Sequence, residues 1–313
     1  MRRILLAHDL ELLLVVLFWG FNVTVVKRCL HEMEPLAFNI VRFSLAAVTL
    51  MALTLWWDGP PRLAPAEIRR FLLLALLGHA LYQICFVLGL ARTTASSTAL
   101  IFGSTPVVVG ILSRAAGHER VGWAGAAGAL VAFGGVALIV HGGTNAGAGA
   151  QGPPAAWLGN LLVMAAVVVW SAYTVLSRDL LRSHSPLRVT ALALSLGTLM
   201  MLPVSIPSLA GQDWAAIGLV TWAGIGYSFV FALVISYILW YRSVRTVGNL
   251  RTALYSNLVP VSGALFGVWL LHERLNAGIG AGAALILGGI LLSRWSDARE
   301  RRAAGEPVIV GEA

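Results

Sequence analysis

The chain has 313 residues, of which 58% are hydrophobic and only 12% are charged. Soluble domains carry about 25% charged residues, so this composition excludes an ordinary soluble protein. Apolar runs of about 18–25 residues, the length that crosses a bilayer as a helix, separate shorter polar segments. The net charge of +8 comes from arginines in those polar segments and does not indicate a nucleic-acid partner. We therefore expect an all-α polytopic membrane protein surrounded by a lipid bilayer.

The apolar runs predict ten transmembrane helices. In chain order these cover residues 10–29, 36–57, 69–90, 94–114, 121–140, 157–178, 187–206, 214–238, 248–271 and 276–295. The first run follows Arg2 and Arg3, but it is longer than the core of a signal peptide and no cleavage site follows it. We therefore expect it to remain in place as the first helix.

The placement of basic residues predicts the orientation. If the N-terminus is cytoplasmic, seventeen of the 22 lysines and arginines lie on the cytoplasmic side and four lie outside. Arg42 falls inside the second helix near its outer end, where its side chain can extend toward the interface. This bias predicts that both termini are cytoplasmic. The near absence of lysine favours a bacterial source and hence the inner membrane.

Residues of the first half recur in the second half at a nearly constant spacing. The pairs 151 positions apart are Trp19 and Trp170, Lys27 and Arg178, Pro35 and Pro186, and Leu36 and Leu187. At a spacing of 154, Pro106 and His118-Glu119-Arg120 recur as Pro260 and His272-Glu273-Arg274. An internal repeat in an apolar chain is typical of transporters built from two related halves.

Because five helices per half is an odd number, the second half must enter the membrane from the opposite side. The sequence predicts two inverted five-helix repeats at 1–141 and 157–296, an extracytoplasmic Gly/Pro-rich linker at 142–156 and a charged cytoplasmic tail at 297–313. Inverted halves permit alternating access, because they can exchange conformations of similar energy. A monomer is then sufficient for transport.

The sequence resembles the drug/metabolite transporter superfamily and, within it, the EamA-type branch. The resemblance covers about residues 8–296 and rests on the repeat, the ten-helix layout, a tryptophan in the first helix of each half, and the proline followed by His-Glu-Arg. In layout the chain is similar to the YddG-type aromatic amino acid exporters. The resemblance implies a central substrate cavity lined by the first, third, fourth, sixth, eighth and ninth helices.

Aromatic and polar side chains share one face on several predicted helices. Such stripes indicate a cavity, because Asn and Gln side chains in hydrocarbon need partners. The predicted substrate-binding residues are Trp19, Asn22, His79, Tyr82, Gln83, Phe102, Trp170, Tyr173, Tyr255 and Ser256. The alternative is helix packing with an interfacial aromatic belt, which fits the aromatic residues near helix ends, including Trp56, Trp214 and Trp240.

Two further features bear on mechanism. Pro106 and Pro260 are expected in the middle of the fourth and ninth helices, where each would bend its helix and act either as a hinge or as a static kink. The predicted helix centres contain no glutamate, which favours facilitated diffusion or exchange over carboxylate-based proton antiport. His79 is the one titratable side chain at a helix centre, and it serves either pH dependence or an interhelical hydrogen bond.

A polar-aromatic cavity suits a small net-neutral amphipathic solute such as a zwitterionic amino acid. A phosphorylated sugar would need Arg or Lys at depth, and we expect Arg42 and Arg251 to be peripheral. We therefore predict export or exchange of aromatic or bulky apolar amino acids, with efflux of apolar drugs or other metabolites as the alternative. An enzyme is disfavoured because no catalytic or metal-binding set shares a common depth, and no cofactor is expected. A membrane sensor would need an appended soluble domain.

Overall fold

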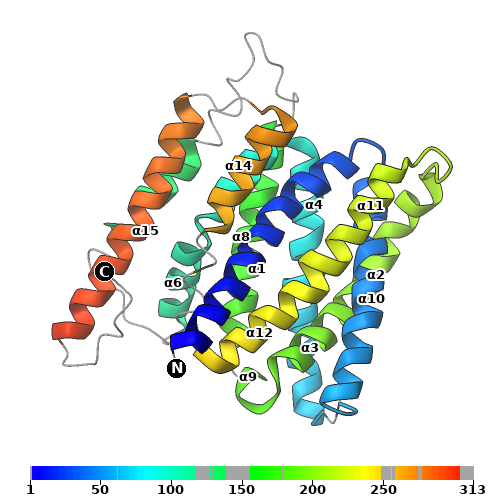
Figure 1. The fold of residues 1–313 in the computed structure, drawn as a ribbon, viewed down its shortest axis with the longest axis horizontal. Coiled ribbons are helices and arrows are strands. Elements are labelled where there is room, and N and C mark those ends of the chain that lie inside the picture. The colour runs from blue at the N-terminus through cyan, green and yellow to red at the C-terminus, as the bar shows by residue number, and fades with distance from the viewer. Residues whose placement is uncertain are drawn as a thin grey trace.

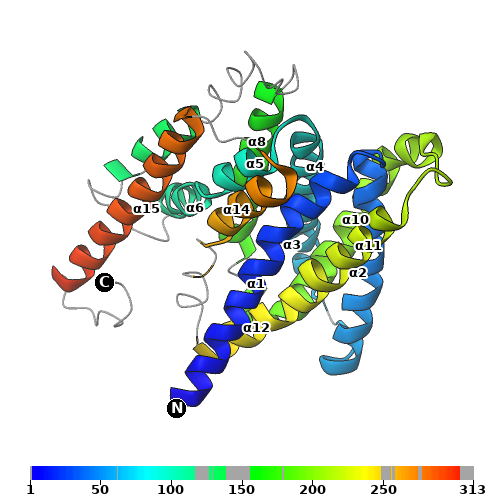
Figure 2. The same cartoon turned by 45° about the horizontal axis from the view of Figure 1, so that its top comes forward.

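A computed structural model describes residues 2–61, 63–116, 127–128, 130–138, 156–177, 180–247, 255, 258–273 and 277–303. In these segments every regular element is a helix, as the composition predicts. Figure 1 shows the helices as a bundle with α15 at one edge and with α2 and α10 at the other. The first turns of α1 and the last turns of α15 lie toward the same end of the bundle, which the second view also shows (Figure 2).

The first half begins with two long helices and continues through two crossings that are each built from several segments. Its elements are α1 (Arg2–Cys29), α2 (Pro35–Trp57), α3 (Pro65–Ala75), the π-helix η1 (Leu76–Leu81), α4 (Tyr82–Arg92), α5 (Ala95–Phe102) and α6 (Thr105–Ala115). Residues 127–128 and 130–138 are also helical and belong to the predicted fifth helix.

The second half repeats this plan. Its elements are α8 (Ala156–Ser177), the short α9 (Leu180–Ser183), α10 (Pro186–Gly211), α11 (Leu219–Tyr227), the π-helix η2 (Ser228–Ile235), α12 (Ser236–Val247), α14 (Val259–Leu271) and α15 (Ala277–Ala303). The predicted ninth helix is described only at residue 255 and from 258 onward. The last helix continues to Ala303, beyond the predicted end at residue 295.

Seven of the described helical stretches are long and apolar enough to cross a membrane. They are Asp9–Cys29, Pro35–Trp57, Pro65–Arg92, Ala95–Leu112, Ala156–Ser177, Pro186–Gly211 and Leu219–Trp240, with shorter apolar helices at Val259–Leu271 and Gly280–Gly289. Large apolar side chains such as Val48, Leu199 and Leu219 are exposed on their outer surfaces. Exposed apolar surface of this kind fits contact with lipid.

The two repeated prolines begin helices and do not bend continuous ones, so the predicted mid-helix position was wrong. In the first half α5 ends at Phe102, and Pro106 is the second residue of α6. In the second half Pro260 is the second residue of α14, after a turn at Leu258. The reason is that proline lacks an N–H and crowds the carbonyl four residues earlier, whereas the first turn of a helix needs no such donor.

Equivalent helices of the two halves run in opposite directions. At the end of α1, Lys27 Nζ donates hydrogen bonds to the carbonyl oxygens of Leu90 (2.8 Å) and Ala91 (3.3 Å) at the end of α4. Just beyond α4, Thr93 Oγ1 donates to Asn160 Oδ1 near the start of α8, at 2.6 Å. The end of α1 and the start of α8 therefore lie at the same end of the bundle.

The pair α2 and α10 is antiparallel in the same way. The backbone N–H of Glu34, at the start of α2, donates to Gln212 Oε1 at the end of α10, at 2.7 Å. At the opposite end of the bundle, Ser185 Oγ, which caps the start of α10, donates to the carboxylate of Asp58 at the end of α2. Each helix of the pair is thus fastened to the other at both ends.

The halves also match in an irregular feature. A π-helical segment begins at Leu76 in the third crossing and another begins at Ser228 in the equivalent crossing of the second half. π-helical turns are rare, and they occur frequently at functional sites. Their shared position marks the middle of these two crossings as the place to look for a site.

Candidate functional site

Five rings from α4, α5 and α8 form one continuous cluster in the bundle. Tyr82 lies 4.9 Å from Trp170, 6.0 Å from Phe102 and 6.1 Å from Phe86, measured between ring centroids. Trp170 in turn lies 5.0 Å from Tyr173. These separations are those of favourable aromatic pairs. We call Tyr82, Phe86, Phe102, Trp170 and Tyr173 the ring cluster. All of them except Phe86 are predicted site residues.

His79 extends the ring cluster toward α2. It lies in η1, is 1% exposed, and its ring is 5.5 Å from that of Tyr173 and 6.4 Å from that of Phe43. Its Nε2 atom is buried and has no hydrogen-bond partner among the described residues. A buried polar atom without a partner is costly, so this nitrogen marks a position where a partner is missing.

A buried polar group from α2 and α4 lies beside these rings. Arg42 Nε and Nη2 donate to Asn39 Oδ1 at 2.9 and 2.8 Å, and Nη2 also donates to Gln83 Oε1 at 3.0 Å. The guanidinium lies 5.2 Å from the ring centre of Phe38 and 5.1 Å from that of Phe43. Gln83, a predicted site residue, is thus held by an arginine.

The position of Arg42 differs most from the expectation based on the sequence. It was expected to be peripheral and to extend toward the interface, but it is 1% exposed and points into the bundle. Two signals could have identified it. A charge inside an apolar span is costly and is usually functional, and Asn39 precedes it by three residues, on the same helix face.

Trp19 and Asn22 form a second group with η2 and α12. Trp19 Nε1 donates to the carbonyl oxygen of Ala232 at 2.8 Å, and Ser228 Oγ donates to Asn22 Oδ1 at 2.6 Å. The Trp19 ring lies 5.2 Å from Trp240 and 6.3 Å from Tyr237. Trp240, which the sequence assigned to an interfacial belt, is therefore half-buried against a predicted site residue.

Tyr237 is a further aromatic residue of the second group. Its ring contacts that of Trp19, with the two centroids 6.3 Å apart. The sequence analysis missed this residue, because its position in a helix gives no sign of which neighbours it meets. The hydrogen bonds and ring contacts of Trp19 and Asn22 within the described segments are with η2 and α12 and not with the ring cluster.

Two predicted site residues remain. Tyr255 is half-buried, and Ser256 lies outside the described residues. The predicted hinge Pro260 is buried at the start of α14. Within the described segments, no group of three His, Cys, Asp or Glu side chains is placed to hold a metal ion.

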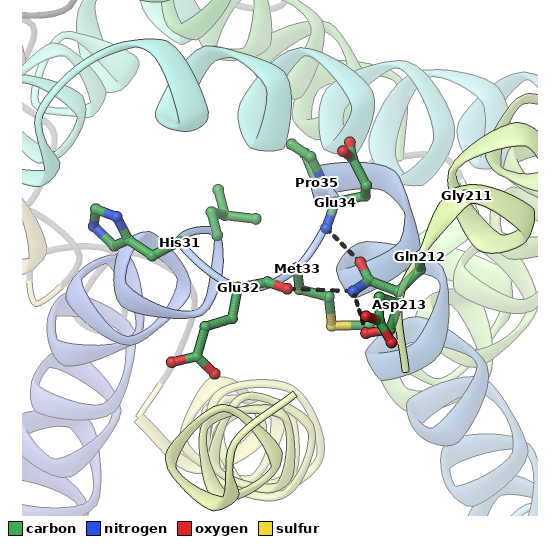
Figure 3. A pocket seen from close by; sticks show the side chains of 9 residues that line it. His31, Glu32, Met33, Glu34, Pro35, Gly211, Gln212 and Asp213 are labelled. Carbon is green, nitrogen blue, oxygen red and sulfur yellow. Dashed lines mark hydrogen bonds between the residues drawn. The ribbon is translucent and has the colours of Figure 1, made fainter. Parts of the chain in front are cut away.

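A cavity of about 270 Å³ lies away from these groups, at the end of the bundle between the α1–α2 turn and the end of α10. Figure 3 shows the Gln212 side chain at its wall, where Nε2 donates to the carbonyl oxygen of Glu32 at 3.2 Å and Oε1 accepts from the Glu34 N–H. The carboxylates of Glu32, Glu34 and Asp213 make its lining acidic. The side chains that line this cavity hold the α1–α2 turn against the end of α10. We therefore interpret it as part of that structural contact and not as the substrate site.

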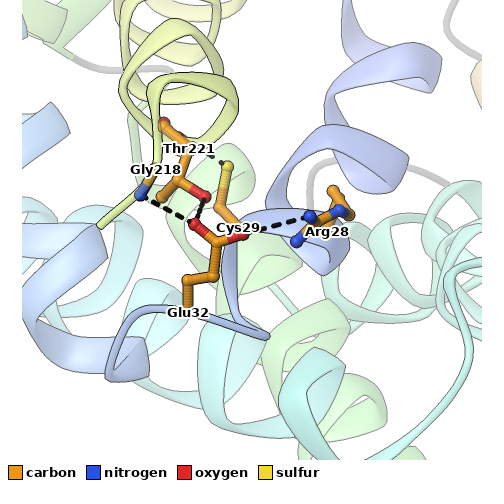
Figure 4. Close-up of polar contacts among 5 residues, drawn as sticks. All are labelled: Arg28, Cys29, Glu32, Gly218 and Thr221. Atoms are coloured by element: carbon orange, nitrogen blue, oxygen red, sulfur yellow. Dashed lines mark hydrogen bonds and ion pairs between the residues drawn. The ribbon is translucent and has the colours of Figure 1, made fainter. Parts of the chain in front are cut away.

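Next to that cavity, Glu32 joins the α1–α2 turn to the start of α11 (Figure 4). Its carboxylate accepts hydrogen bonds from Thr221 Oγ1 at 2.8 Å, from the Gly218 N–H at 3.1 Å and from Arg28 at 3.0 Å. These bonds, the Thr221 bond foremost, hold the pKa of the Glu32 carboxyl below its usual value. Ionised Glu32 thus fastens α11 at this end of the bundle.

The opposite end carries an equivalent contact. His184 Nε2, in the turn before α10, lies 2.9 Å from Glu67 Oε1 in the first turn of α3. In each half, then, the turn before the second long helix holds the start of a multi-segment crossing of the other half. Both contacts use a carboxylate. Glu32 accepts from a hydroxyl, an amide and an arginine, whereas Glu67 pairs with the His184 imidazole and accepts from the Ala64 N–H.

The fold and these groups define a polytopic α-helical membrane protein made of two antiparallel repeats around a buried centre of rings and amides. A model of the EamA-like transporter family matches residues 6–141 and 157–295. The chain belongs to this family, and it is a membrane transporter of the EamA type.

Relatives across bacteria and archaea carry transporter names. The chain is 27% identical to the uncharacterized transporter YetK of Bacillus subtilis over 88% of this chain and 82% of that protein. It is 25% identical to a protein of Escherichia coli named "Probable amino-acid metabolite efflux pump", over 91% and 95% of the two chains. It is 26% identical to a protein of Streptantibioticus cattleyicolor named "Probable terminal-alkyne amino-acid exporter", over 94% and 95%.

The fold is also found in a solved structure, a crystal structure titled only as that of a protein. It superimposes with a TM-score of 0.64 at 20% sequence identity and covers 94% of this chain and 98% of that one. At this identity the similarity concerns the fold alone.

Proposed function

We propose that the protein exports or exchanges small amphipathic metabolites, above all aromatic or bulky apolar amino acids, by alternating access. In this proposal ten helices cross the inner membrane, both termini are cytoplasmic, and the segment at 142–156 links the repeats outside. The predicted repeats, at 1–141 and 157–296, then enter from opposite sides, with the charged tail at 297–313 in the cytoplasm. The antiparallel contacts between α1 and α8 and between α2 and α10 support this arrangement.

The observation that carries the proposal is the ring cluster and its polar neighbours. Five rings from three helices meet beside the buried side chains of His79 and Gln83. Ligand sites are mostly apolar with a few placed polar groups, which is this composition. The rings offer faces to an apolar side chain or an ammonium group. The amino-acid names carried by two relatives point to the same class of solute.

The arrangement of charges supports facilitated transport or exchange. Near the ring cluster the described polar groups are amides, an imidazole, phenols and one guanidinium, and no described carboxylate contacts them. Proton antiport through a carboxylate would need such a group. Pro106 and Pro260 begin helices in equivalent places, and we propose that the breaks before them serve as the hinges of the two halves.

The test is flux of labelled phenylalanine and leucine into proteoliposomes that hold the purified protein, with and without a pH gradient. We expect flux without a gradient and competition by aromatic and bulky aliphatic amino acids. Trp170→Ala should lower the apparent affinity, because it removes the ring at the centre of the cluster. Trp56→Ala is the matched control, since Trp56 is 78% exposed and lies near the end of α2.

Two results would overturn the proposal. One is flux of apolar drugs with no flux of any amino acid, which would make the protein a drug exporter. The other is equal flux in the Trp170→Ala and Trp56→Ala variants, which would place the pathway away from the ring cluster. Flux only with a pH gradient would overturn facilitated transport but leave the class of solute intact.

A further inference from the structure

The cation of Arg42 is buried without a counter-ion in the described part of the chain. Its recorded contacts are the amide oxygens of Asn39 and Gln83 and the rings of Phe38 and Phe43. None of these carries a negative charge. An arginine keeps its charge in proteins, and a buried charge is costly unless an opposite charge is near it.

The neighbours of Arg42 leave only donors unused. An arginine has no acceptor, so the side-chain oxygens of Asn39 and Gln83 must face it and their NH₂ groups must face away. Asn39 Nδ2 meets the sulfur of Met201 at 3.3 Å, which is a weak acceptor. Arg42 Nη1 and Gln83 Nε2 form no hydrogen bond with any residue that the structure describes. The group thus presents N–H donors and one positive charge.

These donors lie next to the ring cluster. Gln83 directly follows Tyr82 in α4, and Phe43, which the guanidinium touches, lies 6.4 Å from His79. The unpartnered Nε2 atom of His79 is thus near the same ring as the guanidinium. Apolar rings on one side and unused donors on the other would match a solute with an anionic head and an apolar body.

We propose that Arg42 and Gln83 bind the carboxylate of the transported solute, with Asn39 as a positioning residue that holds the guanidinium. The inference rests on the proposed function and narrows it to solutes that carry a carboxylate. Arginine suits this task because its planar fork can give two parallel hydrogen bonds to one carboxylate. The apolar part of the solute then lies against the ring cluster.

The alternative is that Arg42 only connects α2 to α4. That role predicts equal effects of an Arg42 substitution on every solute. A carboxylate site predicts instead that the protein distinguishes an amino acid from its methyl ester and from its amide, and that this discrimination depends on Arg42. The ester and the amide keep the side chain and the ammonium group and change only the head.

The experiment measures Kd by thermal-shift titration of the solubilised full-length protein, together with competition in the proteoliposome flux assay. The probes are phenylalanine, its methyl ester, its amide, and sodium chloride as an inorganic anion. For the wild-type protein we expect phenylalanine to bind roughly 10- to 100-fold more tightly than the ester or the amide, the range of a charged hydrogen bond. Arg42→Gln should abolish this ratio, while Arg69→Gln, at an exposed position of α3, should keep it.

Gln83→Glu keeps the proposal testable if Arg42→Gln does not fold. The substitution preserves the size of the side chain and gives Arg42 an internal counter-ion. We expect a folded protein that has lost at least tenfold in affinity for phenylalanine, because the change replaces the Nε2 donor with a carboxylate oxygen that repels the solute's carboxylate and neutralises the charge of Arg42.

The outcomes separate this inference from the proposed function. If wild-type protein transports phenylalanine but Gln83→Glu and Arg42→Gln keep the wild-type ratio, the carboxylate site is wrong and the transport function stands. If ester and amide compete as well as phenylalanine in the wild type, the site is likewise wrong. If chloride alone shifts the unfolding temperature, Arg42 holds an inorganic ion and the inference fails. If no amino acid is transported but drugs are, the proposed function fails.

Discussion

The two halves of the molecule have similar backbone folds but carry different side chains at corresponding positions. At the spacing of 151 that relates α2 to α10, Asn39 and Arg42 correspond to Thr190 and Ala193. At the spacing of 152 that relates the two π-helical segments, His79 and Gln83 correspond to Phe231 and Ile235. The first-half region is polar and buried, whereas Phe231 is 38% exposed. The difference shows that the repeat supplies the architecture and that only one of its two copies carries the polar group.

The volumes of these two regions are also distributed differently. Tyr173 of α8 approaches Gly78 of η1, whereas the corresponding pair in the other region is the small Asn22 with Val230. A large residue thus faces a glycine in the first region, whereas the corresponding positions of the second region carry residues of more similar size. We therefore expect a larger residue at position 78 to be tolerated only together with a smaller one at position 173.

The largest effect is expected for Gly78→Val. An added Cβ would lie 2.3 Å from Cδ2 of Tyr173, so the ring or the helix must move, and overpacking of this kind costs roughly 1–3 kcal/mol. The double variant Gly78→Val/Tyr173→Asn reproduces the second-half pair and should regain stability but not affinity for aromatic solutes. Thermal unfolding in detergent checks both. Gly226→Val is the control, because a Cβ there meets nothing within 4 Å; equal unfolding temperatures for it and Gly78→Val would refute this expectation.

A second test compares the equivalent tryptophans. Trp19→Phe leaves the carbonyl oxygen of Ala232 without its donor and should cost roughly 1–3 kcal/mol of stability. The Trp170 indole forms no hydrogen bond with the described residues, so Trp170→Phe should cost less stability and mainly weaken binding of aromatic solutes. Unfolding temperature and flux competition measure the two effects. Equal losses of stability in both variants would show that the hydrogen bond of Trp19 is unimportant.

The smallest effect concerns the contact at the α1–α2 turn. A carboxyl with a lowered pKa in the folded state stabilises that state above its unfolded value of about 4.3, and this stabilisation is lost as the pH falls through the lowered value. Thr221→Val removes the foremost of the bonds that lower the pKa of Glu32. The variant should therefore unfold at a lower temperature than wild type at pH 7. This difference in unfolding temperature should disappear as the pH falls below the pKa of Glu32.

The control for this test is Thr49→Val on α2, where the exposed hydroxyl bonds only to the carbonyl of Leu45. It should show no difference from wild type that depends on pH. If the difference in unfolding temperature between Thr221→Val and wild type stayed constant from neutral to acidic pH, ionisation of Glu32 would not contribute to this contact.

Much of the fold could be predicted because hydrophobicity sets it locally. Runs of apolar residues long enough to span a bilayer placed the second, third, fourth and sixth helices close to their observed bounds, whereas α1 begins earlier and α12 and α15 end later than predicted. The paired Trp19 and Trp170 revealed the repeat. The breaks before Pro106 and Pro260 were misjudged, because a proline ends one helix or begins another depending on its neighbours. The spacing of His79, Tyr82 and Gln83 predicted one shared helix face. In the structure His79 lies in the π-helical η1 and the other two lie in α4, and their role in binding substrate stays a prediction.

By itself the sequence determined the class of protein and the helices that carry polar and aromatic stripes, because both follow from composition and periodicity within single segments. It also determined the repeat, because the same residue types recur at a nearly constant spacing. Only the tertiary structure decided which stripes meet. It joined Tyr82 to Trp170, placed Trp19 against Tyr237, and turned Arg42 inward onto Gln83. The physical reason is that contacts between helices depend on how each one is rotated and on the volumes of facing side chains, and neither is encoded in the pattern of one helix alone.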